Sequence, residues 1–158
     1  MRSLRVSPIR LGENLKKRLG VKNCPVLSRP KNVADLLKEL PKLDREVLIS
    51  IILDNELRAL AWSIISIGRC EGILSNGRAL MGDLLKNEGA GIILVHTHPD
   101  GNISPSVYEF ELGETISKIA ETLGFQIFDH LIMSGRRIMS IKYNSPTAKY
   151  EPRMQASF

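Results

Sequence analysis

Two short runs of almost uninterrupted apolar residues limit what this chain can fold into. The first, residues 47–53, reads VLISIIL, and the second, Ile92–Val95, ends at His96. Apolar runs of four to eight residues, rich in β-branched side chains, are typical of strands that are buried on both faces. The chain is therefore expected to contain a buried sheet.

The composition allows one well-buried core. The chain has 158 residues, of which 43% are hydrophobic and 25% charged, and Cys24 and Cys70 form no C-x-x-C pair. These values predict one domain, and the cysteines suggest neither a disulfide framework nor a thiolate zinc cage. No stretch approaches the roughly 20 apolar residues of a membrane span, and the first 31 residues lack the apolar block of a secretory signal. We therefore expect a soluble, cytoplasmic protein without a membrane partner.

Positive charge is concentrated at the beginning of the chain. Residues 1–31 hold nine basic residues against one acid, Glu13, which gives +8 there and leaves −3 for the remainder of a chain of net charge +5. Such a segment can contact nucleic acid through phosphates, but no aromatic residue is interleaved to stack on bases. We expect residues 1–31 to form a basic, flexible arm, with weak and non-specific nucleic-acid binding as the alternative.

Five strands and three helices are expected after this arm. The strands are rich in β-branched and apolar residues and are bounded by turns; they span 47–53, 57–67, 91–96, 125–133 and 137–143. Turns at Asp54–Asn55 and Ser134–Gly135 predict two hairpins. The fold class is α/β, a mixed β-sheet flanked by helices, in a domain over residues 32–143 that is followed by a polar tail over 144–158.

The helices are predicted from apolar residues three and four apart. Asn32 is expected to cap a short helix that ends at Pro41, and a second helix covers residues 76–86. Ser106 opens the third helix, and Gly124 stops it. Its core-facing residues are expected to be Phe110, Leu112, Ile116, Ile119 and Leu123.

His96 and His98 follow the second apolar run and indicate a metal site. Side chains two apart on a strand project from the same face, so both imidazoles can reach one cation while Thr97 faces away. Pro99 and Gly101 then break the strand, and two of the chain's three histidines occur at this spacing. The alternative is a pair of histidines that only pack or hydrogen-bond.

A third metal ligand has to come from a nearby carboxylate. A catalytic zinc needs about three protein ligands and one open position, and the candidates within reach are Asp100, Glu109 and Glu111. Glu109 is favoured because it lies in the first turn of the helix that Ser106 opens. The same residues form an S-x-x-E capping box, in which Glu109 instead turns back to the backbone amide of Ser106.

Hydrolysis at such a site also needs a proton carrier and a group that stabilises an oxyanion. Zinc lowers the pKa of its water to about 7, and a carboxyl group off the metal must then move the proton. Glu46, just ahead of the first buried strand, is the upstream candidate, with a charge in the first turn of a helix as the alternative. The Ser106 hydroxyl is the candidate donor to the oxyanion, with the helix N-cap as its other role.

With these residues the chain resembles the RadC-like branch of the JAB1/MPN (JAMM) metalloprotease superfamily. Sites of that superfamily follow an upstream Glu, then H-x-H, seven residues and S-x-x-D. His96-Thr97-His98, seven intervening residues and the S-x-x-E at Ser106–Glu109 keep this spacing. The stretch HTHPDGNISPSVYE is similar to the branch's H-N-H-P-S-G-D-x-x-P-S-x-x-D, and the similarity spans about residues 27–141.

The resemblance implies an α-β-α sandwich, related to cytidine deaminases, that hydrolyses peptide or isopeptide bonds of a peptide or protein substrate with zinc. It implies that His96 and His98 bind zinc, that Glu109 occupies the third-ligand position, that Glu46 is the general acid/base and that Ser106 steadies the intermediate. A deaminase itself is not expected, because the chain lacks the H-x-E and P-C-x-x-C motifs of zinc deaminases.

The chain departs from the family pattern at two acidic positions. Glu109 stands where the family has Asp, and Asp100 stands where Ser is usual, which makes Asp100 a substitute carboxylate. The alternative function is therefore a catalytically weak or inactive RadC-like interaction module, associated with DNA through the basic arm. On a later strand, Asp129 and His130 form a pair that can orient a metal ligand, with a satisfied sheet histidine as the alternative.

Overall fold

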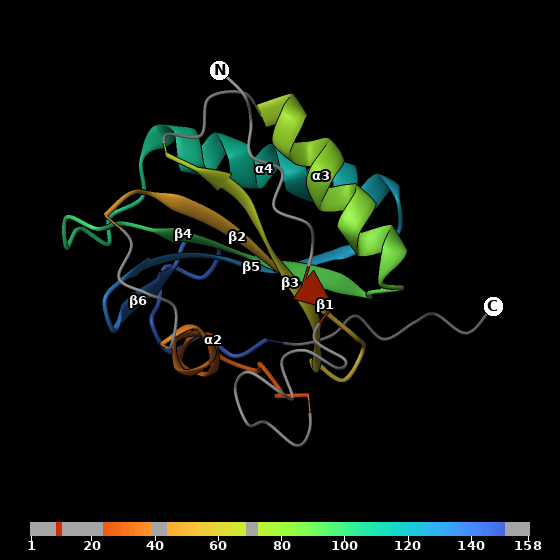
Figure 1. Ribbon diagram of the computed structural model, residues 1–158, viewed down its shortest axis with the longest axis horizontal. Coiled ribbons are helices and arrows are strands. Elements are labelled where there is room, and N and C mark those ends of the chain that lie inside the picture. Colours follow the sequence, from red (N-terminus) through yellow and green to blue (C-terminus); the bar gives the residue numbers. More distant parts are fainter. Residues whose placement is uncertain (1–8, 11–23, 39–43, 69–72, 151–158) are drawn as a thin grey trace.

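A six-stranded mixed sheet lies at the centre of the fold (Figure 1). The computed structural model describes residues 9–10, 24–38, 44–68 and 73–150. The strands are β1 (Ile9–Arg10), β2 (Val47–Leu53), β3 (Ala59–Ile67), β4 (Gly91–Thr97), β5 (Gln126–Ser134) and β6 (Arg137–Ser140), in the order β1-β3-β2-β4-β5-β6. Neighbours β4 and β5 are parallel and the other neighbouring pairs are antiparallel. The mixed sheet and both hairpins are confirmed.

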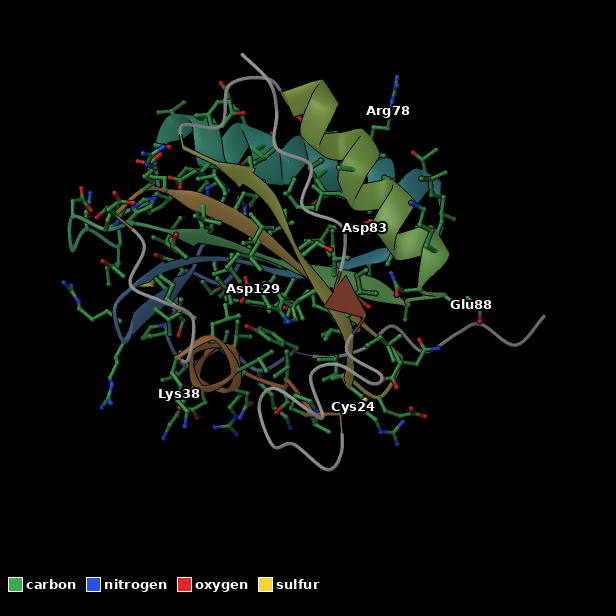
Figure 2. All side chains as sticks on the ribbon, in the orientation of Figure 1. Cys24, Lys38, Arg78, Asp83, Glu88 and Asp129 are labelled. Atoms are coloured by element: carbon green, nitrogen blue, oxygen red, sulfur yellow. The ribbon has the colours of Figure 1, made fainter. Side chains whose placement is uncertain are left out.

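Helices cover both faces of this sheet. They are α2 (Pro30–Leu37), α3 (Ile73–Lys86) and α4 (Val107–Thr122). In Figure 1, α3 and α4 lie together on one face and α2 lies on the other, which confirms the three-layered α-β-α arrangement. In Figure 2, Arg78 of α3 points away from the molecule, on the side of α3 that does not face the sheet. Among the described helices, none combines the length and apolarity that a membrane span needs.

The two apolar runs form β2 and β4, the central strands. All seven residues of β2 are buried, because alternate side chains enter two different cores. The core on the α2 side includes Ile49, Ile51, Ile93 and Val95. The core under α3 and α4 includes Leu48, Ile52, Ile92 and Leu94. His96 continues the second series, so its side chain lies on the face that α4 covers.

The core on the α2 side extends past both expected domain limits. Leu27 precedes residue 32, and Ala148 and Tyr150 follow residue 143, yet all three are buried in this core. The backbone amide of Tyr150 donates a hydrogen bond to the Ser28 carbonyl at 2.9 Å. Most of the basic arm, residues 1–8 and 11–23, and the end of the tail, residues 151–158, lie outside the described residues.

The start of the first helix differs from the prediction. α2 begins at Pro30, with Arg29 as its N-cap and no side-chain cap, so the expected cap at Asn32 was wrong. Proline is favoured at the first helical position because its fixed φ suits a helix and its missing N–H would have no partner there. The expected end of this helix at Pro41 lies outside the described residues.

Helix α4 starts as predicted, but fewer of its apolar residues face the core than predicted. Ser106 is its N-cap, which confirms the predicted start. Phe110 and Leu123 are each 49% exposed, so the prediction that they face the core was wrong. The fully buried apolar residues, Leu112, Ile116 and Ala120, are four apart and follow one line along the helix.

An extra residue in β5 decides which side chains face which layer. Ile92 pairs with Ile127 and Ile93 pairs with Asp129, so Phe128 is a bulge without a partner of its own on β4. Asp129 therefore shares the α2 side with Ile93, where Figure 2 labels it, and His130 lies beside Leu94 on the side of α3 and α4.

Candidate metal centre

The predicted site residues gather at one edge of the sheet, where β4 ends and α4 begins (Figure 1). Because β2 runs antiparallel to β4, the start of β2 lies at the same edge, and Val47 pairs with Thr97. The backbone amide of Val47 also donates to the Thr97 hydroxyl at 3.0 Å. This edge therefore brings the upstream glutamate, the histidines and the first turn of α4 into one region.

Strand β5 and the following loop hold His98. Its backbone amide donates to the Met133 carbonyl at 2.8 Å, and the Ser134 hydroxyl donates to the His98 carbonyl. Arg137 donates to the Gly101 carbonyl at 3.1 Å and so ties the loop to the β5–β6 hairpin. These contacts fix the backbone at His98, and no local pattern in the sequence predicts them.

The Glu109 carboxylate contacts both histidines and also forms the capping box. Its Oε1 atom lies 2.8 Å from Nε2 of His98 and 3.3 Å from Nδ1 of His96. Its Oε2 atom accepts hydrogen bonds from the Ser106 backbone amide at 2.6 Å and from the Ser106 hydroxyl at 2.8 Å. The two roles that the sequence leaves as alternatives are thus compatible, since each uses a different oxygen.

The contacts of His98 require a proton or a metal ion between its ring and Glu109. Nδ1 of His98 lies 3.2 Å from the Asn102 carbonyl oxygen, which can only accept, so Nδ1 carries a proton. In a neutral ring Nε2 is then an acceptor too, yet it faces Oε1 of Glu109, another acceptor, at 2.8 Å. Either a proton shared between these two atoms or a metal ion between them resolves the contact. A carbonyl that holds the far nitrogen of an imidazole is also the usual support of a metal-binding histidine.

The buried groups have the protonation states that metal binding needs. Burial lowers the pKa of His96 to about 4, although Glu109 acts in the opposite direction. Burial raises the pKa of Glu109, but hydrogen bonds from Ser106 and His98 outweigh it and hold that pKa below its usual range. At neutral pH His96 is therefore neutral and Glu109 is ionised, the forms in which imidazole and carboxylate bind metal ions.

The three side chains touch one another rather than surround a centre. Within the described ranges, no group of three or more His, Cys, Asp and Glu side chains is arranged to hold a metal ion as it stands. Ligand atoms of a tetrahedral zinc are about 3.3 Å apart for bonds of about 2.0–2.1 Å. The 3.3 Å contact at His96 matches this separation, and the 2.8 Å contact at His98 is about 0.5 Å shorter. The donor types fit zinc, and a small opening between His98 and Glu109 suffices.

The other acidic candidates lie apart from these contacts. Asp100 is exposed, and its carboxylate accepts from the Asn102 backbone amide at 3.0 Å, which makes it a turn-forming residue. Glu111 is exposed on α4.

Glu46 precedes β2 in an extended segment, and its carbonyl accepts from the Gly68 amide at 2.7 Å. Because strand residues alternate, Glu46 shares a face with Leu48, whose partner on β4 is His96. Its side chain is exposed and makes no ion pair or hydrogen bond with the described residues. Glu46 is not in a helix, so the alternative of a helix charge does not apply.

Asp129 and His130 do not act as a pair. Their side chains lie on opposite faces of the sheet, and the bond between them runs from the His130 backbone amide to Oδ1 of Asp129 at 2.7 Å. The His130 ring instead approaches His96, with ring centroids 4.9 Å apart. Gly113 makes room for this ring in α4, and a glycine inside a predicted helix was the one sequence signal of a close approach there.

Most of this chain is similar in sequence to known proteins. The sequence model of the RadC-like JAB domain matches residues 27–145. The UPF0758 protein of Aquifex aeolicus (strain VF5) is 33% identical over 127 residues, which are 80% of this chain and 52% of that protein. A UPF0758 protein of Desulforudis audaxviator (strain MP104C) is 29% identical over 119 residues, 75% of this chain and 52% of the relative. This chain thus spans about half the length of the curated relatives it matches. By its sequence and by its three-layered fold, the chain belongs to the family of RadC-like JAB domains.

Proposed function

We propose that this domain is a zinc-dependent hydrolase of peptide or isopeptide bonds, with His96, His98 and Glu109 as the metal ligands. The observation that carries the proposal is the contact of both imidazoles with Oε1 of Glu109, at 2.8 and 3.3 Å. A proton or a metal ion has to balance this cluster. Zinc suits a donor set of two imidazoles and one carboxylate, which leaves a fourth position for water.

Zinc bound there supplies a water whose pKa is about 7, and hence a nucleophile near neutral pH. Glu46 then acts as the proton carrier. It accepts the proton of the water that attacks the substrate carbonyl and donates it to the leaving nitrogen. Its exposed position at the start of β2, on the face of His96, gives it access to both solvent and a substrate.

Ser106 has two tasks in this proposal. Its backbone amide and hydroxyl both donate to Oε2 of Glu109, which holds the carboxylate toward the histidines. The amide alone keeps the 2.6 Å bond when the hydroxyl rotates. The hydroxyl is then free to donate to the oxygen of the carbonyl under attack, where a donor stabilises the developing charge.

Zinc analysis of the purified chain tests the metal site. We expect close to one zinc per chain after equilibration, and we expect the double variant His96→Ala, His98→Ala to lose it. The single variant Asp100→Asn is the matched control, because its carboxylate serves a turn and not the histidines. A wild-type chain that stays metal-free throughout a zinc titration would rule the proposal out.

Glu46→Gln tests the proton carrier. The variant should keep its zinc and lose hydrolysis of a fluorogenic peptide library, because an amide cannot shuttle a proton. Asp44→Asn is the matched control, since it removes another exposed carboxylate two residues away. Turnover by Glu46→Gln at the wild-type rate would take Glu46 out of this role.

The rival function is an interaction module that keeps the fold without tight zinc. It is favoured by the closed arrangement of the site, in which both oxygens of Glu109 already have partners. The same zinc titration separates the two functions. Association of the module with DNA through residues 1–31 predicts an affinity that falls steeply with salt. Replacing Lys16, Lys17 and Arg18 with glutamine should reduce that affinity, and an unchanged salt dependence would reject DNA binding through the arm.

A further inference from the structure

His130 is a buried histidine that the proposed reaction does not use. It lies on β5 beside Leu94 and faces the layer formed by α3 and α4, with 3% of its surface exposed. Its ring is tilted by 44° against that of His96, at a centroid distance of 4.9 Å. The His130 ring therefore contacts the ring of a proposed metal ligand, and both rings are buried.

Helix α4 is shaped to admit this ring. A Cβ atom at Gly113 would lie 2.7 Å from Nδ1 of His130, closer than real Cβ contacts. Glycine inside a helix is unfavourable relative to alanine, so its position directly over the imidazole indicates a fitted contact. The imidazole is thus held between β5 and the backbone of α4.

Three ring nitrogens in this region have no partner among the described residues. They are Nε2 of His96 and both Nδ1 and Nε2 of His130, and all three are buried. Buried polar atoms are nearly always hydrogen-bonded, and an apolar side chain at position 130 would fill the space without this defect. The polar ring therefore calls for an explanation beyond packing.

The unpartnered nitrogen of His96 supplies that explanation. A metal-binding imidazole uses one nitrogen as the ligand and donates the N–H of the other to an acceptor. For His98 this acceptor is the Asn102 carbonyl at 3.2 Å. His96 turns Nδ1 toward Glu109, and its Nε2 has no corresponding acceptor.

His130 is suited to be that acceptor. A neutral imidazole has one nitrogen with a free lone pair, and neither nitrogen of this buried ring has another partner among the described residues. With ring centroids 4.9 Å apart, nitrogens turned toward each other can come within the roughly 2.7–3.2 Å of a hydrogen bond.

We propose that His130 is a positioning residue for His96. It accepts the proton of the His96 nitrogen that faces away from Glu109, directly or through one buried water, and so fixes the tautomer and orientation of that ring. This inference rests on the zinc site proposed above and adds to it a residue outside the H-x-H and S-x-x-E pattern.

Zinc affinity of the full chain tests this role. The dissociation constant is measured by competition with a chromophoric chelator for the wild type, His130→Leu and His130→Gln. Leucine removes the acceptor and should weaken zinc binding by about 10- to 100-fold. Glutamine supplies a side-chain acceptor and should stay within about threefold of the wild type.

Two further variants separate positioning from packing. Ile116→Val trims a residue that is fully buried on α4 and leaves both rings in place, so it should lower stability but not zinc affinity. Gly113→Ala keeps His130 but displaces its ring, and it should weaken zinc binding. Gly113→Ala also serves as the test if His130→Leu does not fold.

The tautomer of His96 is a readout that a packing role would not change. Imidazole ¹⁵N spectra of the zinc-loaded wild type should show one tautomer of His96, and those of His130→Leu should show a changed or mixed state. A folded His130→Leu that binds zinc as tightly as the wild type overturns the inference. So does an equal loss of affinity in Ile116→Val. A wild type that binds no zinc instead overturns the proposed function itself.

Discussion

Replacing Glu109 with glutamine should separate the two contacts of this side chain. Glutamine also forms the capping box, because its carbonyl oxygen can accept from the Ser106 amide as Oε2 does now at 2.6 Å. Its amide is neutral, however, and cannot balance a metal ion between His96 and His98. Glu109→Gln should therefore fold normally and lose zinc affinity by about 100-fold or more, exceeding the loss from a supporting residue.

Glu109→Ala should lose stability as well. It removes the two bonds to Ser106 and the two contacts with the histidines, at a side chain that is 5% exposed. A lost helix cap costs about 1 kcal/mol, and each buried partner left unsatisfied costs about 1–3 kcal/mol. With relaxation the total is about 2–4 kcal/mol, or roughly 5–12 °C in Tm for a chain of this size. Glutamine should stay within about 1 kcal/mol of the wild type.

The assay is a thermal melt in chelator, followed by zinc competition on the same samples. Glu111→Gln is the matched control, because Glu111 is exposed on the same helix. Wild-type zinc affinity in Glu109→Gln would refute the assignment of this carboxylate as a ligand. An equal loss of stability in the glutamine and alanine variants would refute the account of the capping box.

Three further predictions concern the scaffold of the site. Gly91→Ala should destabilise the fold by about 3 kcal/mol or more in urea unfolding, because its Cβ would lie 2.1 Å from the Gln126 carbonyl oxygen, whereas Gly82→Ala, with nothing within 4 Å, should not. Burial raises the pKa of Asp129 from 3.8 to about 6, so the stability from its protonated form is present below pH 3.8 and lost as the pH rises through 6. Asp129→Asn should therefore match the wild type near pH 4 and exceed its unfolding free energy by roughly 2–3 kcal/mol at pH 8, and equal values at both pH values would contradict this. Thr97→Val should lower the unfolding free energy by about 1–2 kcal/mol, since it leaves the Val47 amide, now bonded at 3.0 Å, without its acceptor. Thr97→Ser keeps the hydroxyl and should recover this stability.

The central strands could be predicted because strands buried on both faces appear in the sequence as nearly continuous apolar runs. Residues 47–53 coincide with β2, and the expected strand 91–96 is one residue shorter than β4. Both strands have cores on two faces, so every position except Ser50 is apolar until β4 reaches the edge of the sheet at His96. Two sequence features were enough to predict that His96, His98 and Glu109 lie close together: the two histidines are two residues apart on a strand, and Glu109 is at the capping position of a helix.

Contacts between distant segments could not be predicted in the same way. The carbonyl of Asn102 that orients His98, and the bond from Arg137 that holds the loop, depend on tertiary structure and not on side-chain type. The prediction that Phe110 of α4 faces the core was also wrong. Apolar residues occur on more than one side of this helix, and its packing against α3 and the sheet decides which side is buried. Neighbouring strand residues always lie on opposite faces, but it is the bulge at Phe128, which has no local signature, that turns Asp129 toward α2 and His130 toward α3 and α4.

The unpaired Phe128 has a consequence for how this strand tolerates insertions and deletions. Side chains alternate with a period of two, so every position after the bulge keeps its direction only while Phe128 stays outside the pairing with β4. Deleting Phe128 would keep these directions, because Asp129 would still pair with Ile93. If Phe128 instead paired with β4 as an ordinary strand residue, the rest of the strand would invert, which would send the imidazole of His130 into the layer of Tyr150 and the carboxylate of Asp129 toward His96. The pairing register of β5, rather than the identity of any one side chain, thus decides whether a basic or an acidic side chain lies next to His96.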